Sequence, residues 1–172
     1  GYVLQDGDRY RVLAAGYALE SEAKEVKDRL VSEGMDCTVY AIEAPGATFR
    51  VSAEEGQLAQ VESGFSALYQ AQEAMTQAAI AFDRDGQNVS DGQAAVQQIQ
   101  QDLEQQMAAL AAYGDSAPAI ASLLACKGEF TAVLSPLVQS GASSHTEFAA
   151  ALKYAQLAMT HSYEKMVFAL TA

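Results

Sequence analysis

The sequence has no tryptophan, only two cysteines and three prolines, and no long hydrophobic run. So few prolines, with twelve glycines, exclude a collagen-like or disordered chain. No apolar stretch approaches the roughly 18 residues that a membrane span needs, so we expect no membrane insertion by this chain. Cys37 and Cys126 lie in no CxxC motif and no zinc-ligand spacing. We predict two buried free thiols, with a disulfide between them as the alternative.

Positive charge is also scarce, and the formal net charge is −12. Residues 1–53 carry six Lys and Arg against nine Asp and Glu, whereas residues 54–172 carry four against thirteen. Binding to nucleic acid needs a basic surface, and this field would repel phosphate, so we expect no nucleic-acid partner. Half of the residues are hydrophobic, which is enough for a real core in a chain of 172 residues.

Patterns typical of catalysis and metal binding are missing as well. No nucleophile elbow or triad is visible. His145 and His161 lack further ligands at a useful spacing, and the acidic segment 83–88 lacks the glutamate that completes a calcium loop. We therefore predict no enzymatic activity, no catalytic residues, no metal and no cofactor.

The N-terminal region has the pattern of a small sheet with one helix. Asp6-Gly7 is typical of a tight turn, so strands at 2–5 and 8–14 should form a hairpin. With these two residues as the turn, Leu4 pairs with Arg9, Tyr2 pairs with Arg11, and Val3 joins Tyr10 on the buried side.

A helix should follow from about Ser21 to Glu33 and end at Gly34. Alternation then predicts strands at 35–42 and 47–51, separated by Pro45-Gly46. The buried side of the helix should consist of Ala23, Val26, Leu30 and Val31.

The remaining sequence predicts helices. A capping box, Ser52-x-x-Glu55, opens a helix of about thirty residues with no stop before Asp85-Gly86. Apolar stripes predict three more helices, at about 90–113, 116–139 and 144–172, and Pro136 should kink or interrupt the second of these. We therefore expect two domains, 1–68 and 69–172, that share the long helix 53–84.

Residues 8–68 contain short motifs in a characteristic order and spacing, namely Tyr10, Val12, Tyr17, Ala23, Leu30, Gly34 and Phe49-Arg50-Val51. In these residues the segment resembles the SPOR (sporulation-related repeat) family of peptidoglycan-binding domains. The resemblance implies a βαββαβ domain of ferredoxin-like layout that binds glycan strands stripped of stem peptides, in bacterial division or sporulation. It also implies an extracytoplasmic place in the bacterial cell envelope, with any signal or anchor upstream of this chain.

The expected fold class is therefore α+β. It combines a small ferredoxin-like antiparallel sheet with an antiparallel helical bundle, and the long helix fuses the two. The family's last strand has no counterpart after the long helix, so we expect the N-terminal hairpin arm to take its place in the sheet.

The outward positions of these strands predict a binding face for glycan. Arginine forks suit lactyl carboxylates, and tyrosine rings suit the C–H faces of sugars. Alternatively, Leu4, Leu13 and Ile42 make this face apolar enough to dock the C-terminal helices or a second copy. The chain would then be a protein-interaction or dimerisation scaffold that no longer binds glycan. Its partner, a protein or a second copy of the chain, would bind partly through the helices. The predicted glycan-binding residues are Tyr2, Arg9, Arg11, Leu13, Tyr40 and Arg50.

Overall fold

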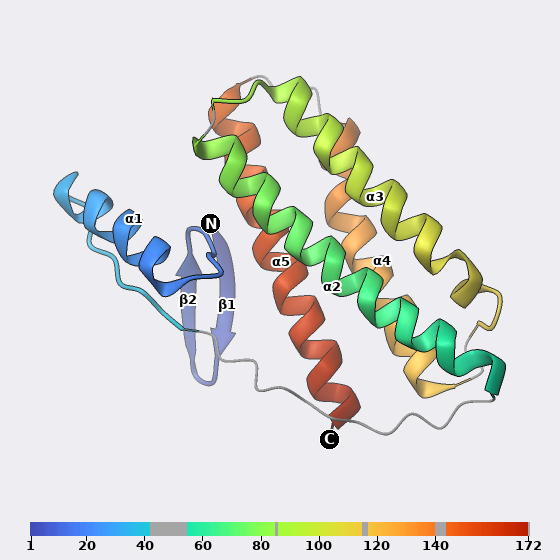
Figure 1. Cartoon of the computed structure of the whole chain (residues 1–172). Helices are drawn as coiled ribbons and strands as arrows, with labels where there is room; N and C mark the ends of the chain where they lie inside the picture. Colours follow the sequence, from blue (N-terminus) through green and yellow to red (C-terminus); the bar gives the residue numbers. More distant parts are fainter. Residues whose placement is uncertain (42–54, 85, 115–116, 140–143, 172) are drawn as a thin grey trace.

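A computed structural model describes residues 1–41, 55–84, 86–114, 117–139 and 144–171 of the chain (Figure 1). The chain begins with a hairpin and one helix, and four longer helices follow. In order, the elements are β1 (Tyr2–Asp6), β2 (Arg9–Leu13), α1 (Glu20–Ser32), α2 (Glu55–Arg84), α3 (Val89–Ala111), α4 (Pro118–Gln139) and α5 (His145–Thr171).

The helices α2 to α5 form an up-and-down bundle in which consecutive helices run antiparallel (Figure 1). The contacts run from α2 to α3, from α3 to α4, from α4 to α5 and back from α5 to α2, which closes the bundle. The hairpin lies beside α5, and α1 projects away from the bundle on the same side. The predicted antiparallel helical bundle is thus confirmed.

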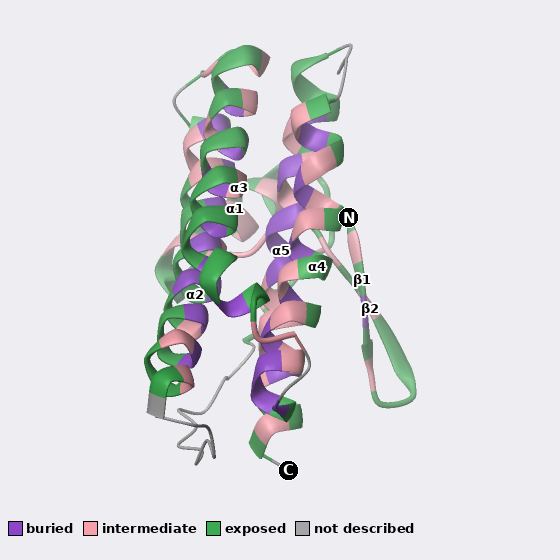
Figure 2. Cartoon of the chain, turned by 90° about the vertical axis from the view of Figure 1, so that its right-hand side faces the viewer, coloured by how far each residue is buried: buried purple, intermediate pink, exposed green. Residues whose placement is uncertain are grey.

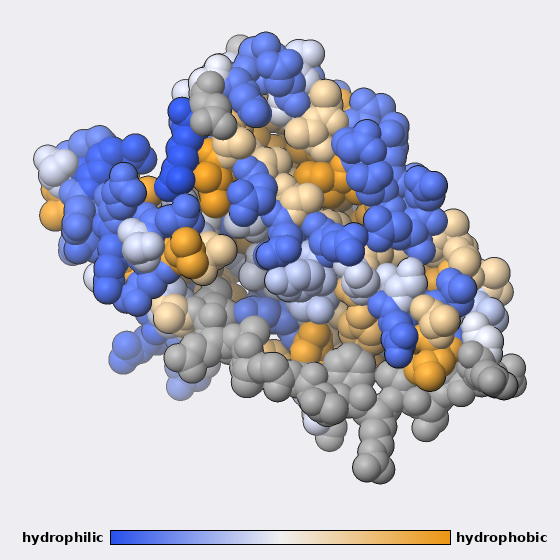
Figure 3. Space-filling model, viewed as in Figure 1, coloured by the Kyte–Doolittle hydropathy of each residue, from blue (hydrophilic) through white to orange (hydrophobic). Residues whose placement is uncertain are grey.

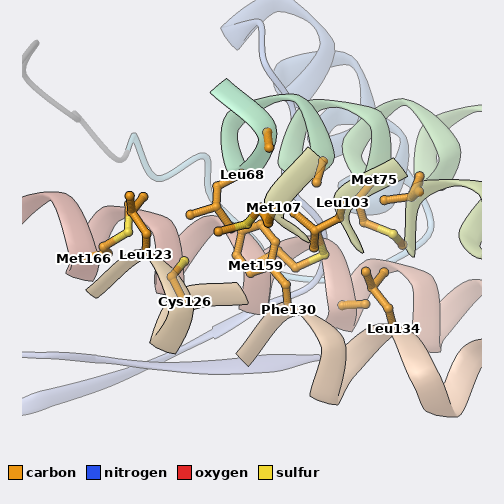
Figure 4. Packing of buried hydrophobic residues seen from close by; sticks show 14 of the residues in the cluster. Leu68, Met75, Leu103, Met107, Leu123, Cys126, Phe130, Leu134, Met159 and Met166 are labelled. Carbon is orange, nitrogen blue, oxygen red and sulfur yellow. The ribbon is translucent and has the colours of Figure 1, made fainter. Parts of the chain in front are cut away.

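The bundle buries one continuous hydrophobic core (Figure 4). Figure 2 shows its buried positions as a stripe along the inner side of each helix. In α3 the apolar stripe from which the helix was predicted is buried at every position: Val96, Ile99, Leu103, Met107 and Leu110. In α2 the apolar stripe is not buried along its whole length, because Leu58 near the start of the helix is 44% exposed.

Helix α4 is long and apolar enough to cross a membrane by length and composition alone. In this structure its inner residues, among them Phe130 and Leu134, are completely buried in the bundle core. Pro136 does not interrupt α4, which continues to Gln139. The prediction of an interruption there was wrong.

The predicted ferredoxin-like sheet was also wrong. Within the described residues the sheet has two strands, β1 and β2, and most of the described chain is helical. Residues 35–41 form no strand. Instead, the Cys37 thiol donates to the carbonyl of Lys27, and Tyr40 packs on Arg11. Alternation placed these side chains on two faces, but a strand also needs a backbone partner. The predicted strand at 47–51 and Ile42 lie outside the described residues.

The hairpin is present, with a register that differs from the predicted one. Its turn is Gly7-Asp8, so Leu4 pairs with Arg11 and Tyr2 pairs with Leu13. Only Gly7 has a positive φ there, 59°. A turn with glycine at its first central position needs a positive φ only at that residue, whereas the predicted Asp6-Gly7 turn would need it at aspartate too.

The buried side of the hairpin is the opposite of the predicted one. Val3 is 57% exposed and Tyr10 is 71% exposed, whereas Leu4 is 9% exposed and faces α5. Alternation sorted the residues correctly into two faces. Which face is buried depends on where α5 lies, and the alternation of the strands carries no information on that.

Helix α1 ends as predicted, at a glycine in the left-handed region. Gly34 has a φ of 87°, its N–H donates to the carbonyl of Val31, and the Met35 N–H donates to that of Leu30. This pair of bonds is a Schellman motif. The predicted buried side of α1 was wrong, because none of its residues is buried and Val31 is 49% exposed.

Candidate functional site

The face that the sequence predicted as a binding surface divides into two halves along the hairpin. The half near the chain terminus packs against α5, where the ring of Tyr2 lies 5.5 Å from that of Tyr154 and 6.0 Å from that of His161. Burial raises the pKa of Tyr2, and Tyr154 and Glu129 raise it further. Leu4 is buried and Leu13 is half-buried beside Tyr2. This half helps to hold the hairpin on the bundle.

The other half lies toward the turn, which projects away from the bundle (Figure 2). Here Asp6, Arg11 and Tyr40 meet, and we call them the hairpin-tip cluster. Arg11 Nε and Nη2 each lie 2.8 Å from Asp6 Oδ2. The guanidinium carbon lies 4.1 Å from the centre of the Tyr40 ring, and the Tyr40 hydroxyl lies 3.5 Å from Asp6 Oδ2.

The hairpin-tip cluster is open to solvent. The side chains of Arg11 and Asp6 are 39% and 41% exposed, and Tyr40 is 39% exposed. The hydrogen bond that Arg11 donates to Asp6 is the main cause of the raised pKa of Arg11. A guanidinium has five N–H donors, more than Asp6 and Tyr40 occupy, so some remain for a ligand.

Two further predicted residues can be placed relative to this cluster. Arg9 is exposed and pairs with Asp6 in the register of the hairpin, so its side chain lies on the same face as Arg11. Arg50 lies outside the described residues. The structure therefore brings Arg9, Arg11 and Tyr40 to the open half of the face.

The sequence pattern missed Asp6 as a member of the site, because we assigned it to the turn. The signal that could have found Asp6 is the preference of glycine for the first central position of a hairpin turn. With Gly7 in that position, Asp6 is the last residue of β1 and pairs with Arg9.

A buried amide fixes the segment that follows the hairpin. Gln156 in α5 is 3% exposed; its Oε1 accepts from the Gly16 N–H at 3.2 Å and its Nε2 donates to the Gly16 carbonyl at 2.8 Å. A Cβ on Gly16 would lie 3.0 Å from that nitrogen. The pair thus ties the chain after β2 to α5. Glutamine in a helix usually faces solvent, so the sequence offered no signal for it.

Other candidates for chemistry are part of the packing. Both cysteines are free, as predicted, but only Cys126 is buried, whereas Cys37 is partly exposed. Burial raises the pKa of Cys126 to about 12, so its thiol is protonated at neutral pH. His145 stacks on Phe82 with ring centres 4.3 Å apart. Among the described residues no group of three His, Cys, Asp or Glu could hold a metal ion.

Comparison with protein-family models, with curated proteins and with solved structures gave no match. The resemblance to the SPOR family therefore stays a prediction, and the geometry of the hairpin is the basis for any assignment of function.

Proposed function

We propose that this chain is a non-catalytic module of the bacterial cell envelope that binds peptidoglycan glycan strands, in division or sporulation. The observation that carries the proposal is the exposed hairpin-tip cluster, in which the Arg11 guanidinium stacks on Tyr40. The resemblance of residues 8–68 to the SPOR family supports the same ligand.

The chemistry of this cluster suits a glycan that has lost its stem peptides. Such a strand exposes lactyl carboxylates at regular intervals between sugar rings. The free N–H groups of Arg11, with Arg9 beside it, can donate charge-assisted hydrogen bonds to a carboxylate. Tyr40 offers an aromatic edge and a hydroxyl to the adjoining sugar, because its ring is 39% exposed.

The position of the cluster also favours an acidic ligand. The chain carries a formal charge of −12, which repels polyanions at long range. The turn of the hairpin extends beyond the bundle (Figure 2), and Arg9 directly follows this turn, with Arg11 two residues further along β2. A strand can reach these arginines while it stays clear of the acidic helices.

The test is co-sedimentation of the purified chain with cell-wall sacculi, before and after amidase removal of the stem peptides. We expect more binding after amidase treatment. We also expect Arg11→Ala to weaken binding to the treated wall about tenfold or more, because one charge-assisted hydrogen bond is lost. Lys165→Ala is the matched control, since it removes one exposed positive charge from α5. Equal binding of R11A and wild type, or no preference for treated wall, would refute the proposal.

A second candidate function is a dimerisation scaffold, and the outer face of the hairpin favours it. Val3 and Val12 form a cross-strand pair, and Tyr10 lies diagonal to Val3. Val3 is 57% exposed, Val12 75% and Tyr10 71%. Apolar side chains gathered on an exposed sheet face are typical of an interface. Light scattering coupled to chromatography tests this function by measuring the oligomeric state. A dimer that the Val12→Lys substitution dissociates would support the scaffold, and a chain that stays monomeric at high concentration would exclude it.

A further inference from the structure

A cavity lies between α1 and the bundle, away from the hairpin-tip cluster. Its volume is about 540 Å³, within the range of small-molecule sites. The loop after β2, α1, α2 and α5 all line it. No residue of α1 is buried, and its contribution to the cavity wall is Glu25, Val26 and Arg29. The surface of α1 in Figure 3 is largely hydrophilic.

The cavity combines charges of both signs with a short apolar wall. Three of the ten Lys and Arg of the chain line it, namely Arg29, Arg84 and Lys153, together with the acids Glu25 and Asp83. Val26, Ala79 and Ile80 supply the apolar part. Lining residues with matched positive and negative groups favour a ligand that itself carries both charges.

Two of these charges have no ion-pair partner among the described residues. Lys153 is paired with Asp83, and Arg84 Nη1 lies 3.3 Å from Glu22 Oε1. Within the described part of the chain, no such bond involves Arg29 or Glu25. Both line the cavity, so a cation and an anion that pair with no described residue border the same space.

Tyr17 also lines the cavity, and Arg29 is one of the charges that act on its hydroxyl. Burial raises the pKa of its hydroxyl, Asp83 raises it further, and Arg29 and Arg84 oppose the rise. The hydroxyl is therefore protonated at neutral pH and lies within the field of both arginines, where it can donate to an anionic group of a ligand.

The spacing of the free charges limits the size of the ligand. Glu25 and Arg29 are four residues apart in α1, which corresponds to about 6 Å along the helix axis. The ends of an extended dipeptide are at most about 7 Å apart. We propose that this cavity binds a small zwitterion of dipeptide size, with its carboxylate on Arg29 and Tyr17 and its ammonium on Glu25. The proposal is independent of glycan binding at the hairpin.

The experiment is calorimetric titration of the full chain with L-alanyl-L-leucine, its C-terminal amide and its N-acetyl form. We expect the unmodified dipeptide to bind at one site and each blocked form to bind at least tenfold more weakly. Arg29→Gln should weaken the dipeptide about tenfold and abolish its advantage over the amide. Glu25→Gln should do the same with respect to the N-acetyl form.

Lys24→Gln is the control, because it removes a positive charge from the exposed side of α1 where Lys24 pairs with Glu20. NMR shifts confined to Gly16, Tyr17 and the cavity wall would support the location, and circular dichroism checks that each variant is folded. No saturable binding, equal affinity for all three peptides, or equal effects of R29Q and K24Q would overturn the proposal. None of these outcomes bears on sedimentation with cell wall, so the two proposals fail separately.

Discussion

At the scale of single residues, glycine decides how closely the helices approach. Gly92 lies buried in the first turn of α3, against Phe82 and Phe148, whose rings meet edge to face 5.2 Å apart. A Cβ on Gly92 would lie 2.5 Å from Phe148 Cε1 and 2.9 Å from Phe82 Cδ2. Both neighbours are fully buried aromatic rings, which cannot move aside without disturbing the core.

We therefore expect Gly92→Ala to destabilise the protein. Overpacking costs about 1–3 kcal/mol, which exceeds the gain in helix propensity of up to about 1 kcal/mol. The control is Gly128→Ala in α4, where a Cβ would meet nothing within 4 Å and which should stabilise by about 0.5–1 kcal/mol. Urea denaturation measures both. An equal gain from the two substitutions would show that α3 does not pack this closely.

At the scale of elements, the hairpin and α1 are held to the bundle by few contacts. The Gln156 amide binds both backbone groups of Gly16, and the Arg84–Glu22 pair, with both side chains partly exposed, adds a second tie. Tyr2 and Leu4 supply the apolar part of the contact with α5. An exposed ion pair contributes little, so we infer that the buried amide and these two side chains dominate the attachment.

We expect Gln156→Leu to release the segment around Gly16 while the bundle stays folded. Leucine keeps much of the packing of glutamine but bonds neither group of Gly16. Hydrogen exchange of the Gly16 amide should accelerate at least tenfold, which corresponds to about 1.4 kcal/mol, the scale of one or two net hydrogen bonds. The Gly34 amide, bonded to Val31 within the α1 cap, is the internal control. Unchanged exchange at Gly16 would show that the tie is unimportant.

At the scale of the whole molecule, the structure consists of a self-contained bundle with a small N-terminal attachment. Every residue of the continuous hydrophobic core comes from the bundle segments that follow residue 54. Leu4 is the one hydrophobic residue of the described N-terminal part, residues 1–41, that is buried. The stability of the bundle therefore does not depend on the hairpin or on α1.

We expect a truncated chain that starts at residue 55 to fold by itself. Circular dichroism should show a helical protein with a cooperative urea transition, and its free energy of unfolding should lie within about 1–2 kcal/mol of the full chain, because few apolar groups are lost from the core. A broad, non-cooperative transition would contradict this expectation. The full chain under the same conditions is the reference.

This division also bears on the predicted domains. The sequence pattern placed the boundary inside the long helix, with α2 shared between a sheet domain and the bundle. In the structure α2 contacts α3, α4 and α5, and its buried positions belong to the bundle core. A stripe along a helix shows that one side is buried, but it does not show which partner buries it.

The sequence by itself determined the local structure. It predicted the helices of the bundle and the end of α1 at Gly34, since caps, glycines and apolar periodicity act within a few residues. It also sorted the hairpin residues correctly into two faces, because the side chains of a strand alternate.

Only the tertiary structure decided which hairpin face is covered and which residues remain free. The position of α5 buries Leu4 and leaves Arg11 and Tyr40 open, and it brings Gln156 to Gly16 across 140 positions of sequence. These outcomes depend on long-range packing, because the position of a whole helix decides which surface is buried. Patterns within a few residues of sequence contain no information on that position.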